Sequence, residues 1–187
     1  EVLAIDLSLA VTVLRMANSV TFGTRSPILG LGRALTRLGQ RTLANHFLER
    51  WKARQDVPAV VQGFLLGHAW RHNLMVACLA EEISRFTKQG SPDAYFSAGL
   101  LHDVGKLLIA QHYPDVFLDI RHKRRLLEQE EPDDALIRKI ENDSVGLDHG
   151  MLGYELCHGW NVPPVVSVGC LHHHVGTEGP WMKLHPR

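Results

Sequence analysis

The stretch YFSAGLLHDVGKLLIA, residues 95–110, sets a histidine beside an aspartate in an otherwise apolar segment. Its apolar residues predict one helix that begins near Pro92 and ends before Pro114. Burial of His102 and Asp103 in such a helix is costly unless both side chains have polar partners. A divalent metal would satisfy both, because imidazole nitrogen and carboxylate oxygen are good ligands. From these residues alone the alternative is that Asp103 caps or orients a local group and His102 forms a hydrogen bond in the core.

Histidines in other segments favour the metal interpretation. The chain has 12 histidines, and His68 and His72 fall one turn apart on one face of a long predicted helix. His149 opens another predicted helix, and residues 172–174 are three consecutive histidines after an apolar run. Four histidine-bearing segments together with the aspartate at position 103 are more typical of a set of metal ligands than of isolated core histidines.

The rest of the chain predicts helices and almost no strand. Apolar residues at helical spacing, with proline and glycine at segment ends, predict helices over residues 6–18, 26–39, 42–54, 56–88, 115–128, 133–143, 148–157 and from 163 onward. In the second of these, Ser26-Pro27 is the start signal and Gly39 the end signal. The predicted fold class is all-α. A length of 187 residues suits one domain or two closely packed subdomains.

The charge pattern argues against nucleic acid as a partner. Lysine and arginine number 20 and aspartate and glutamate number 20, so no net field attracts a polyanion. Residues 1–56 hold eight basic and four acidic side chains, which we interpret as a solvated surface. A helix-turn-helix over residues 31–48 is a minor alternative, with salt-sensitive binding to duplex DNA as its test.

Cysteines and hydropathy predict a cytoplasmic protein with no membrane segment. Cys78, Cys157 and Cys170 are odd in number and far apart, which disfavours a disulfide framework and a thiolate metal site. The apolar opening, residues 2–14, is too short for a span and contains Asp6. Because it starts without a cap, we also expect earlier helices or a preceding domain in the natural chain.

Five motifs, in order along the chain, resemble the HDOD domain, a bacterial signalling module related to the HD and HD-GYP metal-dependent phosphohydrolases. They are residues 14–19, the helix of residues 30–39, the HDVGK stretch of residues 102–106, residues 160–163 and the pair at 173–174. The resemblance implies an N-terminal helical subdomain, residues 1–55, packed on an HD-like helical bundle, residues 56–187. It also implies an attached sensor or receiver domain, or a partner signalling protein.

The resemblance further implies which residues form the site. The implied metal ligands, for one or two ions of iron, manganese, nickel or zinc, are His72, His102, Asp103, His149, His173 and His174. His68 stands where HD-GYP enzymes often have a glutamate, which makes it an additional candidate ligand. In an active enzyme Asp103 would bridge two metals and Lys106 would contact substrate phosphate, so both are the candidate catalytic residues.

Two departures from the HD-GYP pattern bear on activity. Beyond His174 the only acidic residue is Glu178, which is too near to be the closing aspartate of the pattern. The Gly-Tyr-Pro stretch is also absent, and residues 175–180 read VGTEGP instead. Either that segment lies beyond residue 187, or the site lacks a ligand. Together with the usual role of the family, these departures favour a regulatory domain, the output part of a response regulator or similar protein. The alternative is a metal-dependent phosphohydrolase or phosphodiesterase that acts on a nucleotide or cyclic dinucleotide.

Overall fold

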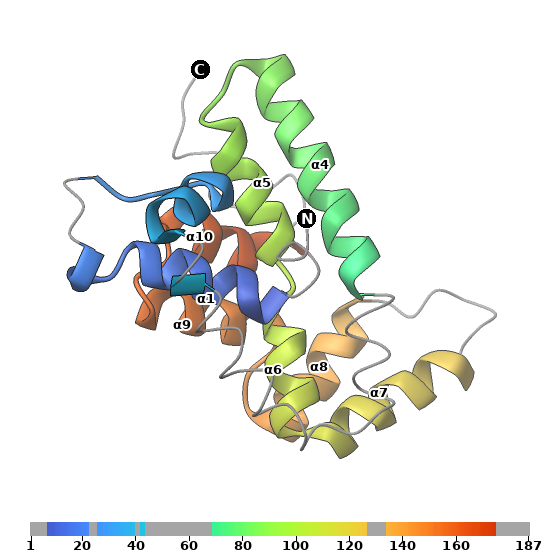
Figure 1. Cartoon of the computed structure of the whole chain (residues 1–187). Coiled ribbons are helices and arrows are strands. Elements are labelled where there is room, and N and C mark those ends of the chain that lie inside the picture. Colours follow the sequence, from blue (N-terminus) through green and yellow to red (C-terminus); the bar gives the residue numbers. More distant parts are fainter. Residues whose placement is uncertain (1–6, 23–25, 40–41, 44–68, 127–133, 175–187) are drawn as a thin grey trace.

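The computed structural model describes residues 7–22, 26–39, 42–43, 69–126 and 134–174, and within them every regular element is helical (Figure 1). The prediction of an all-α fold is therefore confirmed. The elements are α1 (Leu7–Ala17), the short 3-10 helix η2 (Val20–Phe22), a helix over residues 31–39, α4 (Trp70–Thr87), α5 (Pro92–Leu101), α6 (Val104–His112), α7 (Pro114–Leu126), α8 (Asp134–Val145), α9 (His149–Gly159) and α10 (Pro164–His172). None of the described helices is long and apolar enough to cross a membrane.

Helix boundaries mostly follow the signals in the sequence. The Asp148 carboxylate accepts a hydrogen bond from the backbone N–H of Met151 at 2.9 Å and so caps α9. Pro92 and Pro164 each stand in the first turn of a helix, where a missing N–H costs nothing. After α4 the chain turns at Lys88 and Gly90, both with positive φ.

The helix predicted over residues 26–39 begins later than expected, at residue 31. Asn18 is the physical reason. Its amide oxygen accepts a hydrogen bond from the backbone N–H of Ile28 at 2.7 Å, and its amide nitrogen donates to the Ile28 carbonyl at 3.0 Å. Both backbone groups of Ile28 are thus satisfied by a side chain, so residues 27–30 need not be helical.

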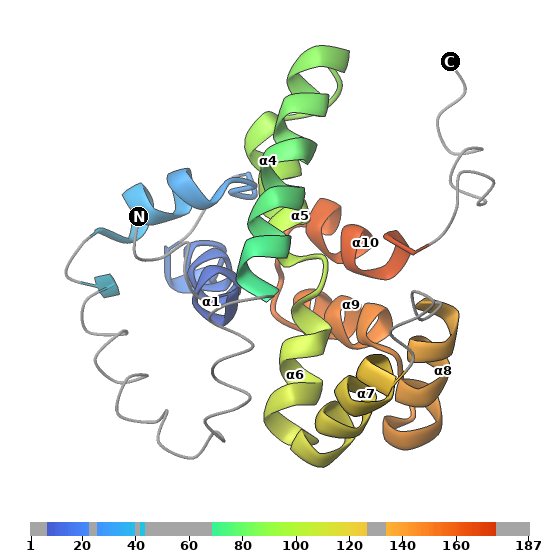
Figure 2. The ribbon, with the colours of Figure 1, turned by 90° about the vertical axis from the view of Figure 1, so that its right-hand side faces the viewer.

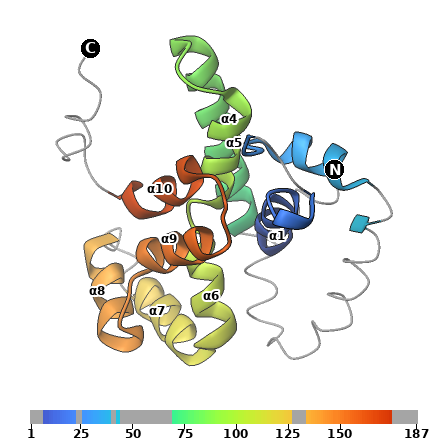
Figure 3. The same cartoon turned by 90° about the vertical axis from the view of Figure 1, so that its left-hand side faces the viewer.

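Helices α4, α5, α6, α9 and α10 pack around the histidine–aspartate stretch. α4 packs along α5 (Figure 1), and Gly99 allows the contact because a Cβ there would lie 2.8 Å from the Ala77 Cα. α9 lies between α10 and α6, as Figures 2 and 3 show from opposite sides. α10 also packs on α5, so the carboxyl end of α10 is brought near the end of α5.

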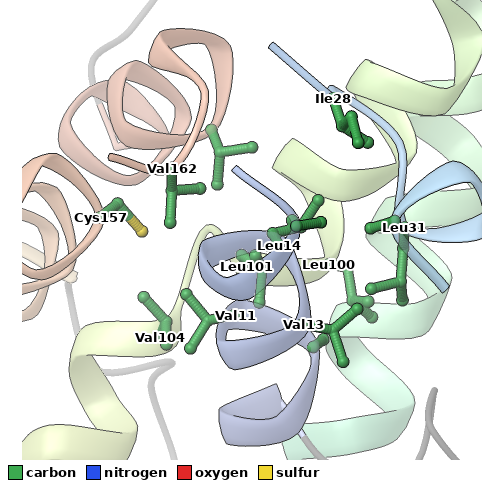
Figure 4. Close-up of a cluster of buried hydrophobic side chains, with 14 of the residues drawn as sticks. Val11, Val13, Leu14, Ile28, Leu31, Leu100, Leu101, Val104, Cys157 and Val162 are labelled. Carbon is green, nitrogen blue, oxygen red and sulfur yellow. The ribbon is translucent and has the colours of Figure 1, made fainter. Parts of the chain in front are cut away.

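The N-terminal helix α1 shares one hydrophobic core with this bundle. Val11 and Leu14 of α1 lie among Leu101 and Val104, the residues that flank the histidine–aspartate pair (Figure 4). The Arg15 guanidinium also lies 4.4 Å from the ring centroid of Trp160, at the end of α9. The proposed division between residues 55 and 56 falls outside the described residues, and it stays a prediction.

The single helix predicted from Pro92 to Pro114 is wrong. α5 ends at Leu101 and α6 begins at Val104, with His102 and Asp103 at the junction. Consecutive residues of a continuous helix project about 100° apart. The interruption therefore lets both side chains reach the same cluster, which a continuous helix would not.

Candidate metal centre

Six of the predicted metal ligands come together in the structure. They arise from four segments: α4, the junction between α5 and α6, the first residue of α9, and the two residues that follow α10. They form two overlapping groups, and within each group the ligand atoms all lie within 4.8 Å of one another. We call Asp103, His149, His173 and His174 the closed group, and His72, His102 and Asp103 the open group. The remaining candidate, His68, lies outside the described residues.

The closed group is well shielded from solvent. His149 Nε2 lies 3.2 Å from His173 Nε2 and 2.8 Å from His174 Nε2. One oxygen of Asp103, Oδ1, lies 3.2 Å from His173 Nε2 and 3.6 Å from His149 Nε2. The His149 side chain is only 1% exposed. Three imidazoles and one carboxylate oxygen therefore face a common point inside the bundle.

The open group uses the other oxygen of Asp103, Oδ2. This atom lies 3.4 Å from His102 Nε2 and 3.7 Å from His72 Nε2, and the two imidazole nitrogens lie 3.2 Å apart. Lys106 Nζ donates to the same oxygen at 2.7 Å. The His72 side chain is 49% exposed, so this side of the cluster faces solvent.

Hydrogen bonds on the outer side of the rings fix how the histidines are protonated. The Nδ1 atom of His102 lies 2.7 Å from the Gly99 carbonyl, and that of His173 lies 2.7 Å from the Cys170 carbonyl. A carbonyl oxygen only accepts, so each Nδ1 carries a proton, and in the neutral form of each ring the Nε2 lone pair is directed inward. This is the arrangement that metal-ligating histidines adopt.

The electrostatics keep His102, His174 and Asp103 unprotonated at neutral pH. Burial lowers the pKa of His102 to about 4. Burial, together with the neighbouring His173 and His149, lowers the pKa of His174 to about 4 as well. Burial by itself would raise the pKa of Asp103, but His173, His102, Lys106 and His149 outweigh it and hold that pKa well below its usual value.

A cation fits this set of donors. Asp103 Oδ1 is buried and has no hydrogen-bond partner among the described residues. The Nε2 atoms of His173 and His149 lie 3.2 Å and 3.6 Å from it. A metal-ligating imidazole has an unprotonated Nε2, and a buried anionic oxygen among such lone pairs is unfavourable until a positive charge lies between them. A divalent metal with nitrogen and oxygen ligands provides that charge.

The alternative without a metal is contradicted in one part and agrees with the structure in two others. Asp103 does not cap a helix through its side chain, but it pairs with Lys106, and His102 lies within hydrogen-bond distance of the buried Gly99 carbonyl. Asp103 occupies the N-cap position of α6, but its side chain makes no capping hydrogen bond there. A capping side chain typically stabilises a helix by about 1 kcal/mol. The carboxylate instead points into the histidine cluster and pairs with Lys106.

Glycine at position 105 brings α6 against the histidine-bearing helix. A Cβ there would overlap the backbone carbonyl of His149 and lie 2.9 Å from the backbone nitrogen of Gly153. Close contact between α6 and α9 is therefore possible only without a side chain at residue 105. That contact places His149 within reach of Asp103.

Two acidic residues behind the imidazoles were not predicted from the sequence. Glu141 is buried in α8, and its Oε2 lies 2.6 Å from His149 Nδ1. Asp134 Oδ2 lies 3.4 Å from His174 Nδ1. A signal for Glu141 exists, because it falls one turn after Ile137 on the apolar face of a predicted helix. Asp134 belongs to an acidic turn and carries no such signal.

An all-helical domain built around a buried histidine–aspartate cluster is the class that this fold and site define. The chain belongs to the HDOD domain family, which it matches over residues 1–175. That match agrees with the motifs described above, and the predicted resemblance is confirmed.

Known relatives support the fold. A crystal structure of the MmoQ response regulator from Methylococcus capsulatus (strain Bath) superposes with a TM-score of 0.71 at 24% identity, over 88% of this chain and 62% of that one. An HDOD domain protein of unknown function from Geobacter sulfurreducens gives a TM-score of 0.51 at 24% identity, over 91% of this chain and 55% of that one. An uncharacterized protein from Treponema pallidum (strain Nichols) is 25% identical over 177 residues, which are 91% of this chain and 32% of that protein. This chain thus spans less than two thirds of each relative.

Proposed function

We propose that this chain is a regulatory signalling domain of a larger bacterial protein, and that its closed group binds a divalent metal. The main support for metal binding is that three imidazole nitrogens converge on Asp103 Oδ1. This oxygen is buried and has no hydrogen-bond partner among the described residues. The metal's contribution when bound is a positive charge that holds four side chains together. Those side chains come from the α5–α6 junction, from α9 and from the end of α10.

The regulatory role is supported by the difference between the two groups. In the described residues the open group has three donors, and the only carboxylate oxygen among them already pairs with Lys106. A single enclosed metal position suits a structural or sensory site better than a two-metal hydrolase.

Signalling partners are the second part of this proposal. The MmoQ protein is named a response regulator, and its chain is longer than this one. We propose that the partner is an attached sensor or receiver domain, or a separate signalling protein, which regulates this domain or is regulated by it. A cytoplasmic location is part of the same proposal.

The metal is tested by elemental analysis of untagged protein, followed by thermal unfolding with and without a chelator. We expect bound metal in the wild type and a lower Tm after chelation, because a ligand that binds only the folded state stabilises it. His173→Ala removes a ligand of the closed group and should abolish both effects. His158→Ala, an exposed histidine on α9, is the matched control. The proposal would be contradicted if the wild-type protein bound no metal and its Tm did not change with the chelator.

A metal-dependent phosphohydrolase is the second candidate function. The observation in its favour is the solvent-facing side of the cluster, where the half-exposed His72 lies beside Lys106 and Asp103. An ammonium at that position can neutralise phosphoryl oxygens. Assays with cyclic dinucleotides and generic phosphodiesters decide between the candidates. Turnover that disappears in His102→Ala and Asp103→Ala, but survives in His158→Ala, would favour the hydrolase.

A further inference from the structure

The two oxygens of the Asp103 carboxylate have different surroundings. Oδ1 faces the Nε2 atoms of His149 and His173 and has no hydrogen-bond partner in the described part of the chain. Oδ2 accepts a hydrogen bond from Lys106 Nζ at 2.7 Å. One oxygen therefore has a cationic partner supplied by the chain itself, and the other has none.

We propose that the Lys106 ammonium takes the place of a second metal, so that the protein binds one divalent ion per chain, in the closed group. This inference rests on the proposed function, because it assigns the number and position of the ions at the same site. It narrows the one or two ions that the sequence resemblance implies to one, and assigns that ion a position. Lys106 is then a residue that sets metal stoichiometry.

The position of Lys106 on α6 favours this role. It follows Asp103 by three residues, so the two side chains lie one turn apart on the same face. An ammonium that donates to a carboxylate forms a strong charge-assisted hydrogen bond. A dication at Oδ2 would have to displace that ammonium and then remain next to it. Repulsion between the two positive charges in a mostly buried cluster disfavours a second ion.

Carboxylates behind the rings favour the closed group for the single ion. Glu141 lies behind His149, and Asp134 lies near the outer nitrogen of His174. Two of the three imidazoles of the closed group thus have an outer carboxylate, whereas the outer nitrogens of His102 and of the third imidazole, His173, meet the backbone carbonyls of Gly99 and Cys170. Outer carboxylates raise the basicity of a ligating imidazole and strengthen its hold on a metal. The negative charge around the closed group is therefore greater.

The test is the metal stoichiometry of Lys106→Met, which keeps much of the side-chain length and removes the charge. Protein stripped with a chelator is dialysed against Mn²⁺, and bound manganese is counted by elemental analysis. Electron paramagnetic resonance then reports whether bound ions are magnetically coupled, as two ions in the adjacent closed and open groups would be. Lys123→Met is the matched control, because Lys123 makes a similar ion pair with Asp119, at 2.6 Å, on α7.

We expect one uncoupled manganese in the wild type and in Lys123→Met, and a coupled pair in Lys106→Met. A coupled pair in the wild type, or a single ion in Lys106→Met, would overturn the inference while the proposed metal site stands. No bound manganese in the wild type, with no bound metal in the purified protein, would overturn the proposed site itself and this inference with it.

A second variant keeps the inference testable if Lys106→Met does not fold. His72→Ala removes an exposed donor of the open group and leaves the closed group intact. With one ion in the closed group, this variant should retain the stoichiometry and affinity of the wild type. A fall in bound manganese would show that the open group holds an ion, and the inference would be wrong.

Discussion

Glu141 accepts two hydrogen bonds from a single residue, His149. The same carboxylate oxygen lies 2.9 Å from the backbone nitrogen of His149 and 2.6 Å from its Nδ1 atom. One buried carboxylate therefore holds both the start of α9 and the orientation of the imidazole ring. His149 Nε2 consequently points toward Asp103, and not toward α8.

Glu141→Gln should weaken metal binding without removing a metal ligand. The amide keeps the shape of the side chain but loses the negative charge that supports the His149 ring. Loss of such an outer partner typically costs a factor of about 10–100 in metal affinity. Competition with a chromophoric chelator measures this change. Glu155→Gln, on the exposed face of α9, is the control and should bind metal like the wild type.

Gly105→Ala should destabilise the fold and disturb the site together. The added methyl group would overlap the His149 carbonyl, so α6 and α9 must separate. Overpacking of this kind costs about 1–3 kcal/mol, measured as a fall in the free energy of unfolding in urea. Gly32→Ala is the control, because Gly32 lies in the helix of residues 31–39 with nothing within 4 Å of the new methyl. It should be neutral or stabilising.

The metal-free protein should lose stability as the pH falls from about 6.5 to about 4. The unfolded chain protonates His102 below pH 6.5, whereas burial lowers the pKa of His102 in the folded protein to about 4. The unfolded state therefore binds more protons in this window, and stability rises with pH across it. For His102 alone the loss on acidification is roughly 3 kcal/mol. The Asp103 carboxylate stays charged throughout, since its pKa is held well below its usual value.

Urea unfolding at several pH values, with chelator present, measures this dependence. His102→Gln should make the slope between pH 6.5 and pH 4 shallower. It should not remove the slope, because the pKa of His174 is lowered in the same direction. A slope that is unchanged in His102→Gln would contradict the assignment.

Asn18→Ala should destabilise the segment that follows α1 and leave the metal stoichiometry unchanged. The Asn18 side chain forms three hydrogen bonds with the backbone of Leu14 and Ile28, and their loss leaves partly buried groups unpaired. We expect a loss of about 1–3 kcal/mol in the free energy of unfolding. Asn142→Ala is the control, because the exposed Asn142 side chain donates only to the Arg138 carbonyl.

In the part of the chain that the structure describes, local patterns predict the helices well but not the interruption between α5 and α6. Apolar spacing, Asp148 and the helix-starting prolines are local signals, and the structure follows them. The break at His102 and Asp103 depends on Gly105 meeting α9, which is a contact between distant segments. No periodicity within residues 92–113 contains that information.

The family resemblance could predict which side chains meet in the cluster, but not the residues that lie behind them. It implied that His72, Asp103 and His149 belong to one site, and the structure brings them together. The exposure of His72 and the role of Glu141 depend on how α4 and α8 pack against the bundle. The pairing of Lys106 with one oxygen of Asp103 also required the three-dimensional arrangement.

Because α1 shares its core with Leu101 and Val104, its docking is coupled to the residues that carry the site. Those two side chains immediately precede and follow the His102-Asp103 dipeptide in sequence. A change that weakens the packing of α1 should therefore lower the affinity of the cluster for its ligand. Ligand binding should in turn stabilise the packing of α1 by the same free energy, because such linkage is reciprocal. The N-terminal helix thus provides a thermodynamic link between the cluster and the attached domain or partner protein proposed above.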